Sequence, residues 1–361
     1  MEVRIAQSAL SDMLAIACKV IPKNNIVPIY GGVLLNANDD GLSLTATDSV
    51  RSVLCMRPAD VKEPGEVILP GMLLHDTVKQ MPDEVVRLLT KGNDCEVSCG
   101  RVRLRPVQFE PWNASLLRFP QGVQRESEVT IPSDIFTFMI DRSCRCVAKE
   151  QLRPELCGVH IVSGDGILRM QATDSYRVIE VSTKSDLGEF EAIVSTDCLS
   201  DAASLARGEL VTVSVGSGMA FVSSESMVHA GRVIAGTYPN LNALIKFGSR
   251  AKVSLDSSEF ARSLKRVKNV AVDSGKVRLS VEGDVLTILA MSPASGEVRD
   301  EVYVDADGDG FMAWFSYKYL SEGVSAMCGE TILTTDGLSS PLVLESHDGC
   351  DVRYMLIPMR G

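Results

Sequence analysis

The sequence lacks the features that mark a membrane, secreted or zinc-binding protein. Its 361 residues contain no stretch of ~18 uncharged apolar residues, the length that a helix needs to cross a bilayer. The start, Met1–Arg4, has no basic segment followed by an apolar core, so a secretory signal is not expected. Ten cysteines are present, but no two are spaced as CxxC and no histidine stands near a cysteine cluster. We therefore expect reduced thiols, no metal, no membrane contact and a cytoplasmic protein.

Patterns of catalytic and nucleotide-binding sites are also missing. There is no Walker phosphate loop and no G-x-S-x-G elbow, and Gly216–Gly218 lacks the third glycine of a dinucleotide fingerprint. Asp305–Gly310 resembles the start of a calcium loop, but the twelfth position is Ser316 instead of a bidentate glutamate. We interpret this run as a charged turn before a strand, and we expect neither an enzyme nor a cofactor.

The most informative feature that is present is an internal repeat. The segment Ala46–Ser49 recurs 126 residues later as Ala172–Ser175, and each copy follows two apolar runs split by an Asp/Gly turn. Such runs predict β-hairpins, and a more divergent hairpin surrounds Glu282–Asp284. Apolar spacing predicts a helix before each hairpin, starting near residues 8, 132 and 256, and a second after it, near 76, 200 and 321. The sequence thus predicts three similar domains, 1–125, 126–250 and 251–361.

Positive charge is scarce overall but concentrated in the repeat. Thirty-six Lys and Arg against 47 Asp and Glu give a net charge of −11, which excludes a surface that is basic throughout. The first helix of each repeat nevertheless carries cations toward its end: Lys19 and Lys23; Arg142, Arg145 and Lys149; Arg262, Lys265, Arg266 and Lys268. The helix dipole explains cations at any one C-terminus. Their presence in all three copies favours a shared surface that faces a polyanion.

Four segments resemble one family, the bacterial sliding clamp or beta subunit of DNA polymerase III. Pro28–Leu35 with Thr45–Asp48 resembles its first-domain signature, and Gln171–Val178 resembles its second-domain ATDGHRL segment. Tyr238–Asn240 is similar to its FPDY segment and Tyr354–Gly361 to its YVVMPMRL tail. The resemblance follows the whole chain in order. It implies the α+β DNA clamp fold, in which two helices per domain pack on antiparallel sheets and a homodimer forms a ring around duplex DNA.

The resemblance also implies a function and its residues. The implied protein is a non-enzymatic processivity factor that slides on DNA of any sequence and binds the replicative polymerase catalytic subunit, the clamp loader, and repair and translesion polymerases. The implied pore contacts are Lys19, Lys23, Lys149 and Arg153, which join Arg142, Arg145, Arg262, Lys265 and Arg266. The implied groove for a partner peptide, between the second and third domains, consists of Leu156, Thr173, Ser175, Tyr176, Arg177, Val178, Pro239, Leu244, Ser340, Ile357, Pro358 and Met359.

This chain departs from the family pattern at several of these positions. Ser175–Tyr176 replaces Gly-His, and Asn242–Ala243 replaces a basic pair, so the preferred peptide is open. The aromatic residue at the dimer-forming edge is Leu104 here, beside Arg101, Arg103 and Arg105, which would complement acidic residues of a third domain.

Two alternatives from other classes stay open. One is a hydrolase that uses Asp48 and Asp174, although their identical placement in the repeat favours a role in the turn. The other is a repeat-built scaffold that binds proteins and no DNA.

Overall fold

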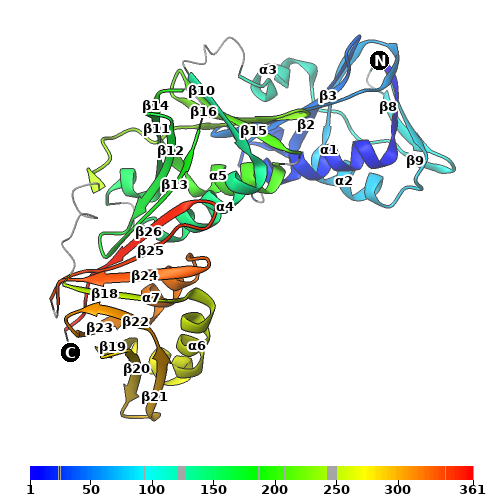
Figure 1. Ribbon diagram of the computed structural model, residues 1–361. Helices are drawn as coiled ribbons and strands as arrows, with labels where there is room; N and C mark the ends of the chain where they lie inside the picture. The colour runs from blue at the N-terminus through cyan, green and yellow to red at the C-terminus, as the bar shows by residue number, and fades with distance from the viewer. Residues whose placement is uncertain are drawn as a thin grey trace. The chain divides into compact units, whose positions relative to one another are not determined.

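The computed structural model describes residues 1–360 except 23, 25, 93, 121–126, 151, 186–187, 207, 242–249 and 338. These residues form antiparallel sheets with helices packed against them (Figure 1). No helix in the described part of the chain is both long and apolar enough to span a membrane. We call residues 2–117 the first repeat, 127–232 the second and 251–356 the third.

The described chain divides into two compact units, Met1–Ser133 with Asp197–Val233, and Asp134–Thr196 with Ile234–Gly361. The second repeat therefore contributes to both units, because its two halves extend the sheets of different neighbours. The boundary expected at residues 125 and 126 lies outside the described residues, and the division into three domains stays a prediction.

The first unit contains two sheets. One has the order β5 (Asp60–Glu63), β1 (Glu2–Ala6), β7 (Val85–Lys91), β8 (Asp94–Cys99), β9 (Val102–Leu104). The other has the order β10 (Ser127–Pro132), β15 (Leu210–Gly216), β16 (Met219–Ser224), β17 (Met227–Arg232), β4 (Arg51–Arg57), β3 (Gly41–Thr47), β2 (Gly32–Asn38), β6 (Gly65–Pro70). The helices are α1 (Gln7–Val20), α2 (Gly71–Lys79), α3 (Ala114–Leu117) and α5 (Thr196–Leu205).

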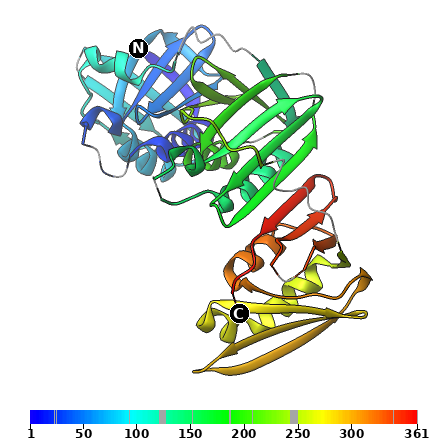
Figure 2. The ribbon, with the colours of Figure 1, turned by 90° about the vertical axis from the view of Figure 1, so that its left-hand side faces the viewer.

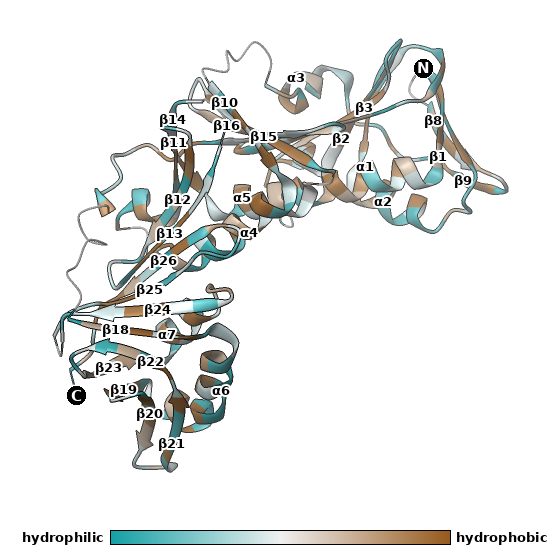
Figure 3. Ribbon diagram, viewed as in Figure 1, coloured by the Kyte–Doolittle hydropathy of each residue, from teal (hydrophilic) through white to brown (hydrophobic). Residues whose placement is uncertain are grey.

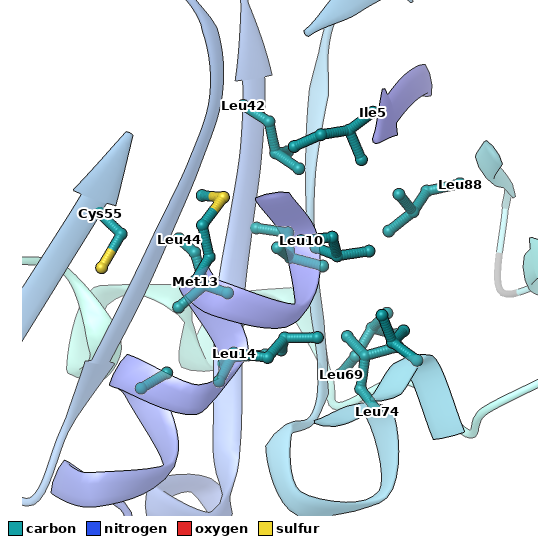
Figure 4. Close-up of a cluster of buried hydrophobic side chains, with 14 of the residues drawn as sticks. Ile5, Leu10, Met13, Leu14, Leu42, Leu44, Cys55, Leu69, Leu74 and Leu88 are labelled. Carbon is teal, nitrogen blue, oxygen red and sulfur yellow. The ribbon is translucent and has the colours of Figure 1, made fainter. Parts of the chain in front are cut away.

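The predicted apolar stripe of α1 is confirmed. Leu10, Met13, Leu14 and Ala17 are fully buried in one cluster with side chains of β3, β6 and β7. Figure 4 shows Leu10, Met13 and Leu14 between Leu42 and Leu44 on one side and Leu69, Leu74 and Leu88 on the other.

The second unit has the same construction. Its large sheet has the order β14 (Phe190–Ser195), β11 (Gly158–Gly164), β12 (Ile167–Thr173), β13 (Arg177–Lys184), β26 (Asp351–Leu356), β25 (Leu342–Ser346), β24 (Glu330–Thr335), β18 (Ala251–Asp256), β22 (Asp305–Gly308). Its small sheet has the order β21 (Gly296–Tyr303), β20 (Val285–Ser292), β19 (Lys276–Glu282), β23 (Met312–Ser316). The helices are α4 (Ser133–Ser143), α6 (Ser257–Ser274) and α7 (Tyr317–Val324).

The amphipathic pattern predicted for the third repeat is confirmed on α6. Asp256 caps the helix by accepting the Glu259 amide at 2.8 Å, and Phe260, Leu264 and Val267 are buried. Hydrophilic and hydrophobic residues alternate along this helix in Figure 3.

Neighbouring repeats join edge to edge. Strand β17 of the second repeat pairs with β4 of the first, from Met227–Cys55 to Gly231–Arg51. In the same way β26 of the third repeat pairs with β13 of the second, from Arg177–Leu356 to Ser182–Asp351. Figure 2 shows the red hairpin β25–β26 continuing the green sheet of the second repeat. Each of these joints lies within one compact unit.

Three local expectations are wrong. The second helices begin at Gly71, Thr196 and Tyr317, four or five residues earlier than predicted, directly after the strands that precede them. The first helix of the second repeat ends at Ser143, whose hydroxyl donates to Met139 O, and a 3-10 turn follows it. Arg145 therefore lies in that turn, and Lys149 lies beyond it. Asp305–Gly308 forms the edge strand β22 instead of a charged turn, because it pairs with β18.

Candidate functional site

The repeated turn has the same hydrogen bonds in both copies. The Asp48 carboxylate accepts the amides of Val50 and Arg51 at 2.9 and 2.6 Å. The Asp174 carboxylate accepts those of Tyr176 and Arg177 at 3.1 and 3.2 Å. At the third position of each turn Ser49 and Ser175 have φ of 75°, a left-handed conformation. Both aspartates thus serve as turn residues, as their placement in the repeat predicted.

The arginine that ends each turn reaches the next repeat. Arg51 donates from Nε to Asp48 at 3.0 Å and from Nη1 to Asp201 of α5 at 2.6 Å. Arg177 donates from Nε to Asp174 at 3.0 Å and forms an ion pair with Glu322 of α7. Each arginine is therefore held between a carboxylate of its own turn and a carboxylate of the following repeat.

Among the described residues, tyrosine rings lie beside the second of these arginines. Tyr176, which is 58% exposed, stacks with Tyr319 of α7, with ring centroids 6.4 Å apart. The Arg177 guanidinium lies 4.3 Å from the centre of the Tyr319 ring, and the Tyr354 hydroxyl donates to Tyr319 O at 2.8 Å. A hollow of about 430 Å³ opens beside them. It is lined by Val147–Glu150, Leu152, Arg153, Leu156, Asp174–Arg177, Lys318 and Tyr319.

The groups around Arg177, at the base of this hollow, keep its guanidinium charged. Burial alone would lower the pKa of Arg177, but its hydrogen bonds to Tyr354 and to the Glu322 carboxylate help to outweigh burial and raise it. Burial raises the pKa of the Tyr354 hydroxyl, which stays a neutral hydrogen-bond donor. The hollow therefore has a fixed cation at its base, and Asp174 and Glu322 compensate its charge.

The predicted groove residues separate into two hollows. Leu156, Ser175, Tyr176 and Arg177 line the hollow described above. Pro358 and Met359 line another hollow with Trp314, where the Met359 amide donates to Trp314 O at 2.7 Å. Ile357 stands between them, since its amide donates to Tyr176 O at 3.1 Å.

The remaining groove predictions have other positions. Val178 belongs with Leu156, Tyr238 and Met355 to a buried apolar cluster, and Thr173 donates to Arg177 O within the turn. Pro239 is exposed and Ser340 half-buried, and neither borders the two hollows. Leu244, with Asn242 and Ala243, lies outside the described residues.

Sequence reasoning missed Tyr319 and Glu322. They are the third and sixth residues of α7, the positions that Cys198 and Asp201 occupy in α5. An alignment of the second helices would have found them as the counterparts of residues at the first joint.

The predicted pore residues differ in how firmly they are held. The Arg142 guanidinium lies 3.4 Å from the centre of the Phe138 ring and donates to Ala326 O, so it packs between α4 and the third repeat. Lys19 donates to Ser204 at 2.7 Å, Arg145 bonds Asp141 at 2.6 Å, and Arg266 bonds Asp300 at 2.8 Å.

The other cations of this set are exposed. Among the described acidic side chains none forms an ion pair with Lys149, Arg153, Arg262, Lys265 or Lys268. Lys23 lies outside the described residues. Lys19, Arg145 and Arg266 are also exposed, so the two groups differ in their polar partners and not in their exposure.

The residues expected at a dimer edge lie at the end of a sheet. Strand β9, which contains Arg103 and the half-buried Leu104, is the last strand of its sheet. Arg101, Arg103 and Arg105 are exposed, and Arg105 bonds Glu96 at 3.0 Å.

Comparison with known families gives one consistent result. Residues 1–111 match the N-terminal domain of the DNA polymerase III beta subunit, residues 130–240 its central domain, and residues 244–360 its C-terminal domain. The chain is 26% identical to the beta sliding clamp of Streptomyces coelicolor, over 100% of this chain and 99% of that protein. It is 27% identical to that of Caulobacter vibrioides, over the full length of both.

Solved structures share the fold. The sliding clamp from Bacillus subtilis superposes with a TM-score of 0.93 at 21% identity, over 100% of this chain and 99% of that one. The Pseudomonas aeruginosa clamp bound to griselimycin superposes with a TM-score of 0.90 at 22% identity, over the full length of both.

Proposed function

The chain belongs to the beta subunit family of DNA polymerase III, and from that premise we propose which of its surfaces hold DNA, a second copy and partner proteins. As a sliding clamp it confers processivity on the polymerase and catalyses no reaction itself. A protein in this role works on the bacterial chromosome, in the cytoplasm.

The proposal of a closed ring rests on the strand pairing that occurs twice between neighbouring repeats. The last strand of the second repeat pairs with β4, and the last strand of the third pairs with β13. Their counterpart in the first repeat is β9, and the counterpart of β4 and β13 in the third repeat is β21. Among the described strands β9 and β21 are each paired on one side only. A β9–β21 pairing between two copies would repeat the same joint and leave neither edge free.

Charge supports this pairing. Arg101 and Arg103 are exposed at the β9 edge, and Glu297 and Glu301 are exposed on β21. Opposite charges on two facing edges fix the register of association and exclude pairing of like edges. The homodimer is therefore a head-to-tail arrangement of repeats that closes after two chains.

The exposed cations of the first helices and the loops after them are proposed to face the DNA. Contacts with phosphates need positive charge and no base-specific geometry, so the ring slides on any sequence. Lys149, Arg153, Arg262 and Lys265 have this role, while Arg142 chiefly holds the fold. An acidic chain can bind DNA in this way because topological closure, and not net charge, retains it.

The hollow at Tyr176 and the neighbouring hollow at Met359 are proposed to bind an extended apolar peptide. This groove would serve the polymerase catalytic subunit, the clamp loader, and repair and translesion polymerases in turn.

Retention on circular DNA tests the proposal. The labelled protein, loaded by its ATP-dependent loader onto a nicked circular plasmid, should co-elute with the plasmid in gel filtration. Cutting the plasmid once should release it, because a ring slides off a free end. A protein that stays on linear DNA, or that binds circles without the loader, is a direct DNA binder and not a clamp.

A further inference from the structure

The two joints between repeats contain the same latch, which we define as an arginine held by two carboxylates from different repeats. At the first joint the latch is Asp48, Arg51 and Asp201. At the second it is Asp174, Arg177 and Glu322. The aspartate of the turn and the arginine each recur 126 residues later, from Asp48 to Asp174 and from Arg51 to Arg177. The third member is the sixth residue of α5 in the first latch and of α7 in the second.

A second contact repeats beside each latch. Lys19 donates to Ser204 at 2.7 Å at the first joint, and Arg145 donates to Ser325 at 3.1 Å at the second. Lys19 and Arg145 are also 126 residues apart. The duplicated contacts show that the latch belongs to the joint, whether or not a hollow lies next to it.

The aromatic positions distinguish the second joint. Tyr176, Tyr319 and Tyr354 there correspond to Val50, Cys198 and His229 at the first joint, by the same turn position, the same helix position and the same strand register. The latch of the second joint thus lies next to a hollow that tyrosine side chains help to line. Lys318 and Tyr319 of the third repeat line this hollow, whereas Tyr176 and Arg177 come from the second repeat. Tyr354 is buried and supports Tyr319 by donating to its carbonyl oxygen.

We propose that Glu322 is a positioning residue of the peptide groove, which acts by holding Arg177 and by closing the joint between the second and third repeats. The groove has its shape only while the latch is closed, since its walls come from both sides of the joint. A peptide that fills it must then stabilise the closed joint, and the closed joint must raise peptide affinity by the same factor. This inference rests on the peptide groove of the proposed function.

The first joint supplies a matched control. Glu322→Gln and Asp201→Asn each remove one carboxylate from an equivalent latch, and only Glu322 holds an arginine that lines the groove. Both variants should lower the melting temperature by similar amounts. The probe is a fluorescein-labelled peptide from the C-terminal tail of the cognate replicative polymerase, and its Kd is measured by anisotropy.

We expect Glu322→Gln to weaken the peptide about tenfold and Asp201→Asn to leave its Kd unchanged. Glu322→Asp keeps the carboxylate and should bind more tightly than Glu322→Gln. In the wild type, hydrogen exchange of the Ile357 amide, which is bonded to Tyr176 O, should slow when peptide is present.

The outcomes separate the two proposals. If the wild type binds no peptide, the groove of the proposed function is wrong. If the wild type binds it and Glu322→Gln binds equally well, the groove stands and the latch has no part in it. Equal weakening by Glu322→Gln and Asp201→Asn would mean that general loss of stability, and not the position of Arg177, sets the affinity.

Discussion

Replacing Gly323 by alanine tests how tightly the second joint is packed. A methyl group added to Gly323 of α7 would meet Cε1 of Tyr354 and would lie 2.6 Å from its Cδ1 and 2.9 Å from its Cζ. The Tyr354 ring is 1% exposed, and its hydroxyl is held by Tyr319 O at 2.8 Å, so the ring has no space into which to retreat. Overpacking of a filled core costs about 1–3 kcal/mol. Alanine regains up to ~1 kcal/mol of helix propensity, and the clash should still exceed that gain.

We therefore expect Gly323→Ala to lose about 1–2 kcal/mol in the free energy of unfolding. Urea unfolding is followed by fluorescence of Trp314 in a Trp112→Phe background, because Trp112 belongs to the first unit and is 75% exposed. Gly164→Ala is the control, since no heavy atom lies within 4 Å of its added methyl and its φ is ordinary. It should change stability by less than about 0.5 kcal/mol. Equal midpoints for the two variants would refute the packing argument.

Two further predictions follow from burial and charge. Burial in β17 lowers the pKa of His229 to about 4 from 6.5, so between these values only the unfolded chain takes up the proton. Its contribution to stability is complete above pH 6.5 and is lost as the pH falls toward 4, by about 2 kcal/mol at pH 5. Between pH 7.5 and 5.0, the free energy of unfolding in urea should therefore drop less for His229→Gln than for the wild type. Equal drops would contradict the assignment. Lys265→Ala should reduce the salt slope of duplex DNA binding in anisotropy titrations by about 0.9 and leave the melting temperature unchanged. Arg142→Ala should do the reverse, because its guanidinium packs on Phe138; a reduced slope at an unchanged melting temperature would assign Arg142 to the DNA surface instead.

The sequence could predict the local elements because their signals are local. The apolar stripes of α1 and α6 depend on residues within a few turns of one another, and both are found as predicted. The end of α4 was missed, since Arg145 and Val147 continue a helical pattern that the 3-10 turn at Cys144 interrupts. Nothing in the sequence marked Asp305–Gly308 as a strand, because its partner is β18, far away in the chain.

The candidate site was predictable only in part, for the same reason. The role of Asp174 in the turn could be inferred from the repeat, because the amides that it accepts are two and three residues away. The partner of Arg177 could not, since Glu322 lies 145 residues further along the chain. Tyr319 carries no pattern of its own, and only its equivalence to Cys198 points to the joint.

The absence of the turn motif from the third repeat is explained by the joints. At the first two turns the arginine bonds a carboxylate of the following repeat in the same chain, Asp201 or Glu322. In the third repeat the equivalent strand, β21, ends its sheet among the described strands and pairs with no strand of another repeat. The turn after β20 is held from within its own repeat, where Asp273 of α6 accepts the hydroxyls of Ser292 and Ser295. A pair of catalytic carboxylates would have no reason to occur only at turns whose arginine bonds a neighbouring repeat. The pattern that first suggested a pair of catalytic aspartates therefore occurs at the two joints between repeats that the structure describes, and the proposed β9–β21 joint between two chains would lack this latch.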